Sequence, residues 1–203
     1  MLTNNPFGLA PFSHIGGGII RPDIYPGTIA SGAAFNVFLN APIQIDAATP
    51  SGNLILATAQ GAAGAASAAQ RILGSFQGVE FTLTATGRRT VSNMWPTGTV
   101  ATNIVAWHTR DPNIAYRIQA NGPVAATAVG AQLGITTNGT NNGNTTTGFS
   151  TVGADTTNLT QTSTHQLRII GFDPDINNTP GDAFTSLIVQ ISAHQDVAQV
   201  NAY

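Results

Sequence analysis

The sequence predicts an all-β protein, either a jelly-roll-like β-sandwich or a β-barrel, with one short Ala-rich helix and an extended N-terminal arm. Apolar and polar residues alternate with a period of two in most segments after residue 33. These segments recur roughly every eight to twelve residues, with Pro- or Gly-containing turns between them, which favours a sandwich or barrel over parallel βαβ units. The chain of 203 residues is long enough to bury a core without disulfides.

Residues 1–33 differ from the rest and are predicted to form the arm. Their prolines and glycines disfavour a helix or a long strand. The large apolar side chains among them are too many for a solvated tail, so we expect them to bury in grooves. The predicted partner-binding residues of the arm are Phe7, Leu9, Phe12, Ile19, Ile20, Ile24 and Tyr25. Whether the grooves belong to this chain or to a neighbour is open, with the neighbour slightly favoured.

Residues 34–203 are expected to form a single β-rich domain. Alternation predicts strands over 35–39, 54–59, 79–85, 88–95, 100–107, 113–120, 161–172 and 184–194. The helix candidate is the alanine-rich segment 62–76, although nearby glycines weaken it. Asn-Gly pairs within 135–155 predict an exposed loop or hairpin tip, which we expect to point outward.

Composition excludes several classes of function. Charged residues are only 8 % of the chain, the basic residues are all arginine, and cysteine is absent. A nucleic-acid partner is therefore not expected, and disulfides and cysteine-ligated zinc are ruled out. No segment resembles a secretory signal or has the roughly 20 strongly apolar residues that span a bilayer. We expect a soluble protein made in the cytoplasm, with no membrane partner.

No catalytic motif is present, so the sequence predicts a protein that is not an enzyme and needs no cofactor. The G-x-S-x-G elbow is missing, and a phosphate-binding loop cannot form without lysine. The four histidines do not have the spacing of a zinc site. Asp173 and Asp175 begin like a calcium loop, but the required glycine and final carboxylate are missing, which favours a backbone-capping turn. Whether that loop binds an ion is left open.

The polar residues suggest a protein that works in an assembly. Threonine, asparagine and glutamine replace the lysine and glutamate that normally keep copies of a soluble protein apart. Neutral polar groups are easier to desolvate at an interface, and sheet edges without lysine are open to pairing. Biased composition alone is the simpler alternative.

The last third of the chain resembles small virion proteins of tailed bacteriophages. The resemblance lies in HQLRIIGF (165–172), GDAF (181–184) and LIVQISAHQ (187–195). It implies a capsid cement or decoration protein, an auxiliary head protein that is often trimeric or dimeric. Such a protein is made in the host cytoplasm, lies on the capsid surface of the virion and bridges neighbouring subunits of the major capsid protein.

Two other functions stay open. One is a different virion structural component, such as a tail, fibre or shell subunit. The other is a carbohydrate-binding β-sandwich that would use Trp95, Trp107 and the loop at 138–147, although tryptophan in a β-protein is more often part of the core.

Overall fold

The computed structural model describes residues 3–17, 24–46, 51–60, 70–139, 141–161 and 165–197. These residues form twelve strands and one short 3-10 helix, η2 (Ala126–Ala128). The strands make two antiparallel sheets that do not close into a barrel. The all-β, sandwich-like prediction is therefore confirmed, and the barrel alternative is not observed.

The first sheet contains six strands, and every neighbouring pair is antiparallel. In spatial order they are β1 (Ala10–His14), β8 (Ile114–Gln119), β12 (Ser186–Ile191), β11 (Leu167–Phe172), β9 (Gln132–Ile135) and β10 (Ala154–Thr160). The outermost strands are therefore β1 and β10, and the outer edge of β10 is partly occupied, because Ala154 bridges Ala120 and Thr156 N donates to Asn121 Oδ1.

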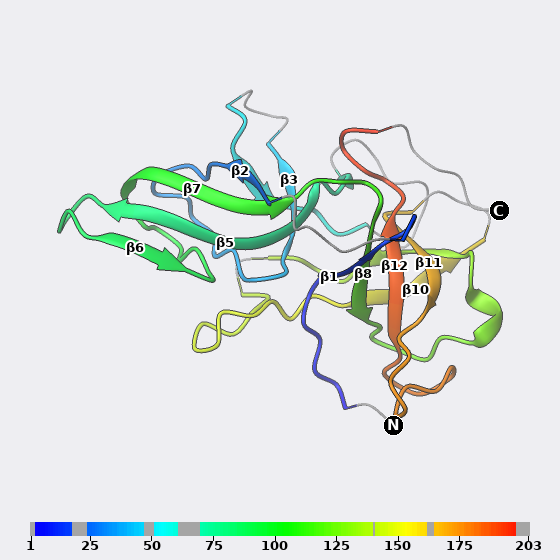
Figure 1. The fold of residues 1–203 in the computed structure, drawn as a ribbon. Helices are drawn as coiled ribbons and strands as arrows, with labels where there is room; N and C mark the ends of the chain where they lie inside the picture. The colour runs from blue at the N-terminus through cyan, green and yellow to red at the C-terminus, as the bar shows by residue number, and fades with distance from the viewer. Residues whose placement is uncertain are drawn as a thin grey trace.

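The second sheet also contains six strands. Five follow one another in the order β2 (Ile24–Gly27), β7 (Ala101–Thr109), β5 (Gly74–Leu83), β3 (Pro42–Ile45) and β4 (Leu54–Leu56), and β6 (Arg89–Ser92) pairs with β5. Figure 1 shows β5, β6 and β7 extending away from the first sheet as a long hairpin layer.

Each sheet buries its own apolar core. Side chains alternate across a strand, so every second residue of a strand faces the same layer. The core of the first sheet includes Ile114, Tyr116, Ile118, Leu133, Leu167, Leu187 and Val189, and that of the second includes Ile43, Leu73, Phe76, Val79, Phe81, Trp95 and Ala106. The two sheets thus supply separate hydrophobic clusters.

The sheets are joined where β7 leads into β8. The hydroxyls of Thr109 and Tyr116 lie 2.9 Å apart and form a buried hydrogen bond across this corner. Nearby, the hydroxyl of Ser75 donates to the carbonyl of Leu9 at 2.6 Å, which links β5 to the segment before β1. These contacts hold the two clusters together.

A glutamine amide also links the sheets at the far end of β12. The side chain of Gln195 accepts a hydrogen bond from Ile45 N at 2.7 Å and donates one to Ile45 O at 3.0 Å. His194 forms an isolated bridge with Ile72 beside it. Residues 194–195 thereby hold β3 of the second sheet against the first.

The predicted helix at 62–76 is wrong where the structure describes it. Residues 61–69 lie outside the described residues, but Gly74 already begins β5. Ile72 belongs to the core of the first sheet, whereas Leu73 belongs to that of the second. Consecutive side chains that face opposite layers require an extended backbone, so burial on both sides overrides the helix propensity of the alanines.

The N-terminal segment contributes a short strand to each sheet. β1 pairs with β8, and β2 pairs with β7. Leu9 and Ile29 are almost completely buried, one in each core. Within residues 1–33, the described parts therefore pack against this chain's own body.

Most of the predicted strands are present, with shifted ends. The exception is 35–39, where only Val37 and Leu39 form isolated bridges. Five short strands were not predicted, namely β1 and β2 in the expected arm, and β3, β9 and β10. β9 is fully buried and reads QLGI, so it lacks the alternation that identifies a half-exposed strand.

The buried amide of Gln166 joins three segments and uses its full hydrogen-bonding capacity. Its Oε1 accepts from Gln60 N at 3.2 Å and Ile135 N at 3.1 Å. Its Nε2 donates to Thr58 O at 2.8 Å and to Gln70 O at 2.6 Å. An amide with two donors and two accepted bonds is completely satisfied, which makes its burial favourable.

We predict that Gln166→Glu destabilises the fold by about 3 kcal/mol or more, because a carboxylate would face two backbone carbonyls without a proton to share. Urea denaturation of the variant measures this loss. Gln161→Glu, at an exposed position, is the matched control and should change stability little. Equal effects of the two substitutions would contradict the role of Gln166.

Candidate functional site

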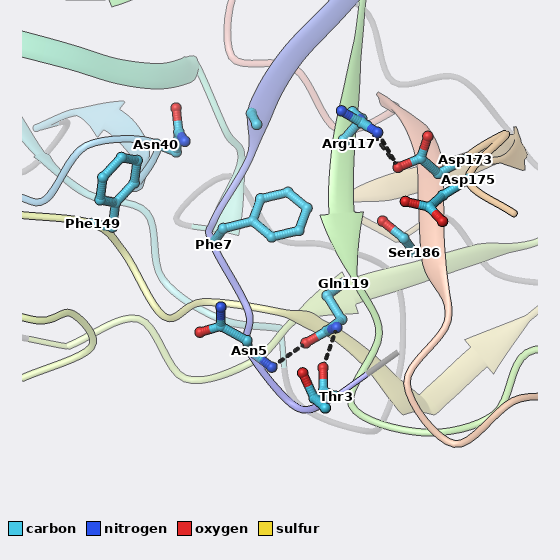
Figure 2. A pocket seen from close by; sticks show the side chains of 11 residues that line it. Thr3, Asn5, Phe7, Asn40, Arg117, Gln119, Phe149, Asp173, Asp175 and Ser186 are labelled. Carbon is cyan, nitrogen blue, oxygen red and sulfur yellow. Dashed lines mark hydrogen bonds and ion pairs between the residues drawn. The ribbon is translucent and has the colours of Figure 1, made fainter. Parts of the chain in front are cut away.

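A cleft lies on the face of the first sheet opposite its core. Because side chains alternate along β8, Arg117 and Gln119 face away from Tyr116 and Ile118. The cleft has a volume of about 450 Å³. Figure 2 shows its lining residues, which are Thr3, Asn5, Phe7, Ala10, Asn40, Arg117, Gln119, Phe149, Asp173, Asp175 and Ser186.

An ion pair between Arg117 and Asp173 lies at one end of the cleft. Arg117 Nε donates to Asp173 Oδ2 at 2.8 Å, and Nη2 donates to the same oxygen. The Asp173 side chain is only 6 % exposed, whereas that of Arg117 is 40 % exposed. Water can therefore solvate the guanidinium if the pair is broken, but it cannot reach the carboxylate, which depends on Arg117 for its charge partner. The guanidinium also lies over the ring of Phe12, 5.3 Å from the ring centroid, in a cation–π contact.

The N-terminal segment forms one wall of the cleft and is held there by Gln119. The amide of this glutamine accepts from Asn5 N at 2.8 Å and donates to Thr3 O at 2.9 Å. Gly8 then has a φ of 79°, and any Cβ there would collide with the carbonyl of Asn40. Glycine is therefore required for the close approach that places Phe7 in the cleft.

A second lobe, of about 420 Å³, continues the cleft toward the 144–151 loop. The two lobes share Asn5, Phe7 and Phe149, and the second is also lined by Pro6, Asn144, Thr147, Ser150 and Thr151. The loop keeps its shape because Asn144 Oδ1 accepts hydrogen bonds from the backbone of residues 146 and 147. The Asn/Thr-rich segment thus forms part of a concave surface.

The structure separates the predicted partner-binding residues of the arm. Phe7 lines the cleft, Phe12 is 37 % exposed beside it, and Leu9 is completely buried in the core. Ile24 and Tyr25 belong to β2. Ile19 and Ile20 lie outside the described residues. A contact between this segment and a neighbouring molecule stays a prediction.

The two tryptophans do not form an exposed platform. Trp95 is completely buried and packs edge-to-face against Phe81, with ring centroids 5.2 Å apart. Trp107 lies half-buried on β7, opposite Pro26 and Gly78. A tryptophan with no exposed ring face cannot stack on a sugar, so Trp95 belongs to the core.

The Asp173–Asp175 loop caps its own backbone, as the sequence suggests. Asp175 Oδ1 accepts from Asn177 N at 2.8 Å. Asn178 donates to the carbonyls of Asp173 and Ser186 and accepts from Ser186 N. Within the described ranges, no three His, Asp or Glu side chains gather in a way that would hold a metal ion.

Sequence reasoning did not identify the cleft, because its residues come from six separate parts of the chain, at 3–10, 40, 117–119, 144–151, 173–175 and 186. Comparison of the chain with protein-family models, curated proteins and solved structures gives no match. In the part of the chain that the structure describes, no helix has the length and apolar character needed to span a membrane.

We predict unequal effects from breaking the ion pair of the cleft. Arg117→Leu leaves a buried carboxylate without its cation and should cost about 3 kcal/mol, whereas Asp173→Asn leaves a half-exposed guanidinium and should cost about 1 kcal/mol. Urea denaturation at pH 7 measures both. Arg88→Leu, at an exposed arginine, is the control. Equal losses for the two variants would contradict the asymmetry.

We also predict that His194 makes stability depend on pH. Burial lowers the pKa of His194, an effect partly opposed by Asp196. As the pH falls, His194 therefore takes up a proton in the unfolded chain before it does so in the folded chain. Uptake by the unfolded chain lowers the free energy of unfolding, so this stability is fully present above pH 6.5 and decreases as the pH falls below it. Urea midpoints between pH 7.5 and about pH 5 measure the slope.

His194→Asn should flatten this slope, because the asparagine side chain does not titrate. It can still accept the hydrogen bond that Asp196 N donates to His194 Nδ1 at 3.1 Å. An unchanged slope in the variant would show that other groups cause the pH dependence.

Proposed function

We propose that the protein is a non-enzymatic structural component of a virion, a cement or decoration protein that lies on the capsid surface and bridges neighbouring major capsid subunits. The proposal rests first on the resemblance of residues 165–195 to small virion proteins of tailed bacteriophages. In the fold, these residues include β11 and β12, which occupy central positions in the first sheet. The resemblance therefore covers a structural hairpin rather than a peripheral tail.

The outer edge of β10 is the observation that supports this function most directly, and its first residues are occupied within the chain: Ala154 bridges Ala120, and Thr156 N donates to the side chain of Asn121. The sequence of β10 is ADTTNLT, and its only charged residue is Asp155. The Asp155 carboxylate already accepts hydrogen bonds from the backbone and hydroxyl of Thr157. Leu159 is 36 % exposed on the same strand. An edge without lysine or proline offers backbone donors and acceptors to a strand of another subunit.

The described ion pairs reduce the surface charge further. Arg89 pairs with Glu80, Arg110 with Asp196, and Arg117 with Asp173. Interface cores are depleted in charged residues because a buried charge must lose its hydration. A largely neutral surface fits a protein that meets its partners, the major capsid protein and further copies of itself, over a broad contact area.

Deleting residues 1–33 would not test this function cleanly, because it removes β1, β2 and three core side chains. A substitution at the β10 edge is more selective. We predict that the protein sediments with expanded capsid shells in a saturable manner and that Leu159→Lys weakens this binding at least tenfold, since lysine blocks edge pairing. Quantitative co-sedimentation with the shells of its own virus measures the binding.

Val100→Lys is the matched control, because Val100 is 58 % exposed in a turn of the second sheet. Circular dichroism and light scattering of both variants check the fold and the mass in solution. A wild-type chain that does not bind shells would refute the cement function. Equal binding by both variants would refute only the role of the β10 edge.

A further inference from the structure

The cleft on the first sheet has a shape that the assembly function does not require. Its two lobes, of about 450 and 420 Å³, lie next to each other and share the lining residues Asn5, Phe7 and Phe149. Each lobe is within the range of roughly 300–1,000 Å³ that small-molecule sites occupy in proteins. Two joined lobes suit an extended ligand better than a compact one.

The polar groups of the cleft favour an uncharged ligand. Among the described lining residues, only Arg117, Asp173 and Asp175 are charged, and the first two neutralise each other. An anion would meet the Asp175 carboxylate, and a cation would meet the guanidinium. The amide of Asn5 and the hydroxyl of Ser186 can each donate and accept hydrogen bonds, which matches the same dual capacity of ligand hydroxyl groups.

Two aromatic rings supply apolar contact within this polar lining. Phe149 is 44 % exposed and Phe7 is half-buried, and both line each lobe. Figure 2 shows the ring of Phe7 on the side of the N-terminal segment that faces Arg117, and Phe149 on the other side of that segment. The ring face of an aromatic side chain packs well against a flat apolar surface such as the C–H face of a sugar ring.

We propose that this cleft is a binding site for a neutral oligosaccharide, whose rings pack on Phe149 and Phe7 and whose hydroxyls bond to Arg117, Asn5 and Ser186. The site is largely preorganised. Gln119 fixes the backbone at residues 3 and 5, and the guanidinium is held by Asp173 and by the ring of Phe12. Groups that are already ordered lose little conformational freedom on binding, which favours affinity.

The test is an NMR titration of the full ¹⁵N-labelled chain with maltohexaose, cellohexaose, chitohexaose and mannohexaose. We expect at least one of these to shift the amide signals of Asn5, Phe7 and Phe149 in a saturable manner. Phe149→Ala and Asn5→Ala should each weaken that binding at least tenfold. Val91→Ala, at a residue that is 69 % exposed on β6, should leave it unchanged.

Three results would overturn the proposal. The first is the absence of localised shifts with all four oligosaccharides at millimolar concentration. The second is equal binding by the wild-type chain and both cleft variants. The third is a stronger response of the same amides to pentalysine or to a sulfated oligosaccharide, which would assign the cleft to a charged ligand.

Discussion

The hydrogen bonds of one buried amide hold the first sheet to the segments that lead into the second. Gln166 lies just before β11, and its side chain contacts the backbone at residues 58, 60, 70 and 135. Without it, the buried backbone N–H groups of Gln60 and Ile135 would lack partners, and each unsatisfied group is costly in a medium of low polarity. The position of β9 and the path of the chain between β4 and β5 depend on this contact.

Other side-chain amides repeat this arrangement. Gln119 fixes the N-terminal segment, Gln195 pairs with the backbone of Ile45, and Asn178 closes the turn before β12. An amide presents the same donor and acceptor as a peptide group, so it can replace a missing strand neighbour without introducing a charge. The abundant neutral polar residues, which the sequence analysis assigned to interfaces between molecules, therefore also connect segments within the chain.

The sequence predicted the strands that have one buried and one more exposed face. It did not predict strands whose two faces are both buried. β7, β8 and β12 alternate between core and outer face, and their existence followed from the pattern. β9 is buried along its whole length, and the segment before β5 sends adjacent side chains into different cores, so neither carries a period of two. The cleft could not be predicted, since Arg117 and Asp173 meet only because β12 pairs with both β8 and β11, and Asp173 directly follows β11.

The pairing of Gln195 with Ile45 has a kinetic consequence. These residues are separated by 150 positions, whereas Leu167 and Ile191 pair within one hairpin. The entropy lost on closing a loop increases with its length, and folds rich in distant contacts form slowly. The β11–β12 hairpin should therefore form early and the attachment of β3 late. Until that attachment is made, the backbone of Ile45 lacks its two hydrogen bonds to Gln195 and is open to pairing with another chain.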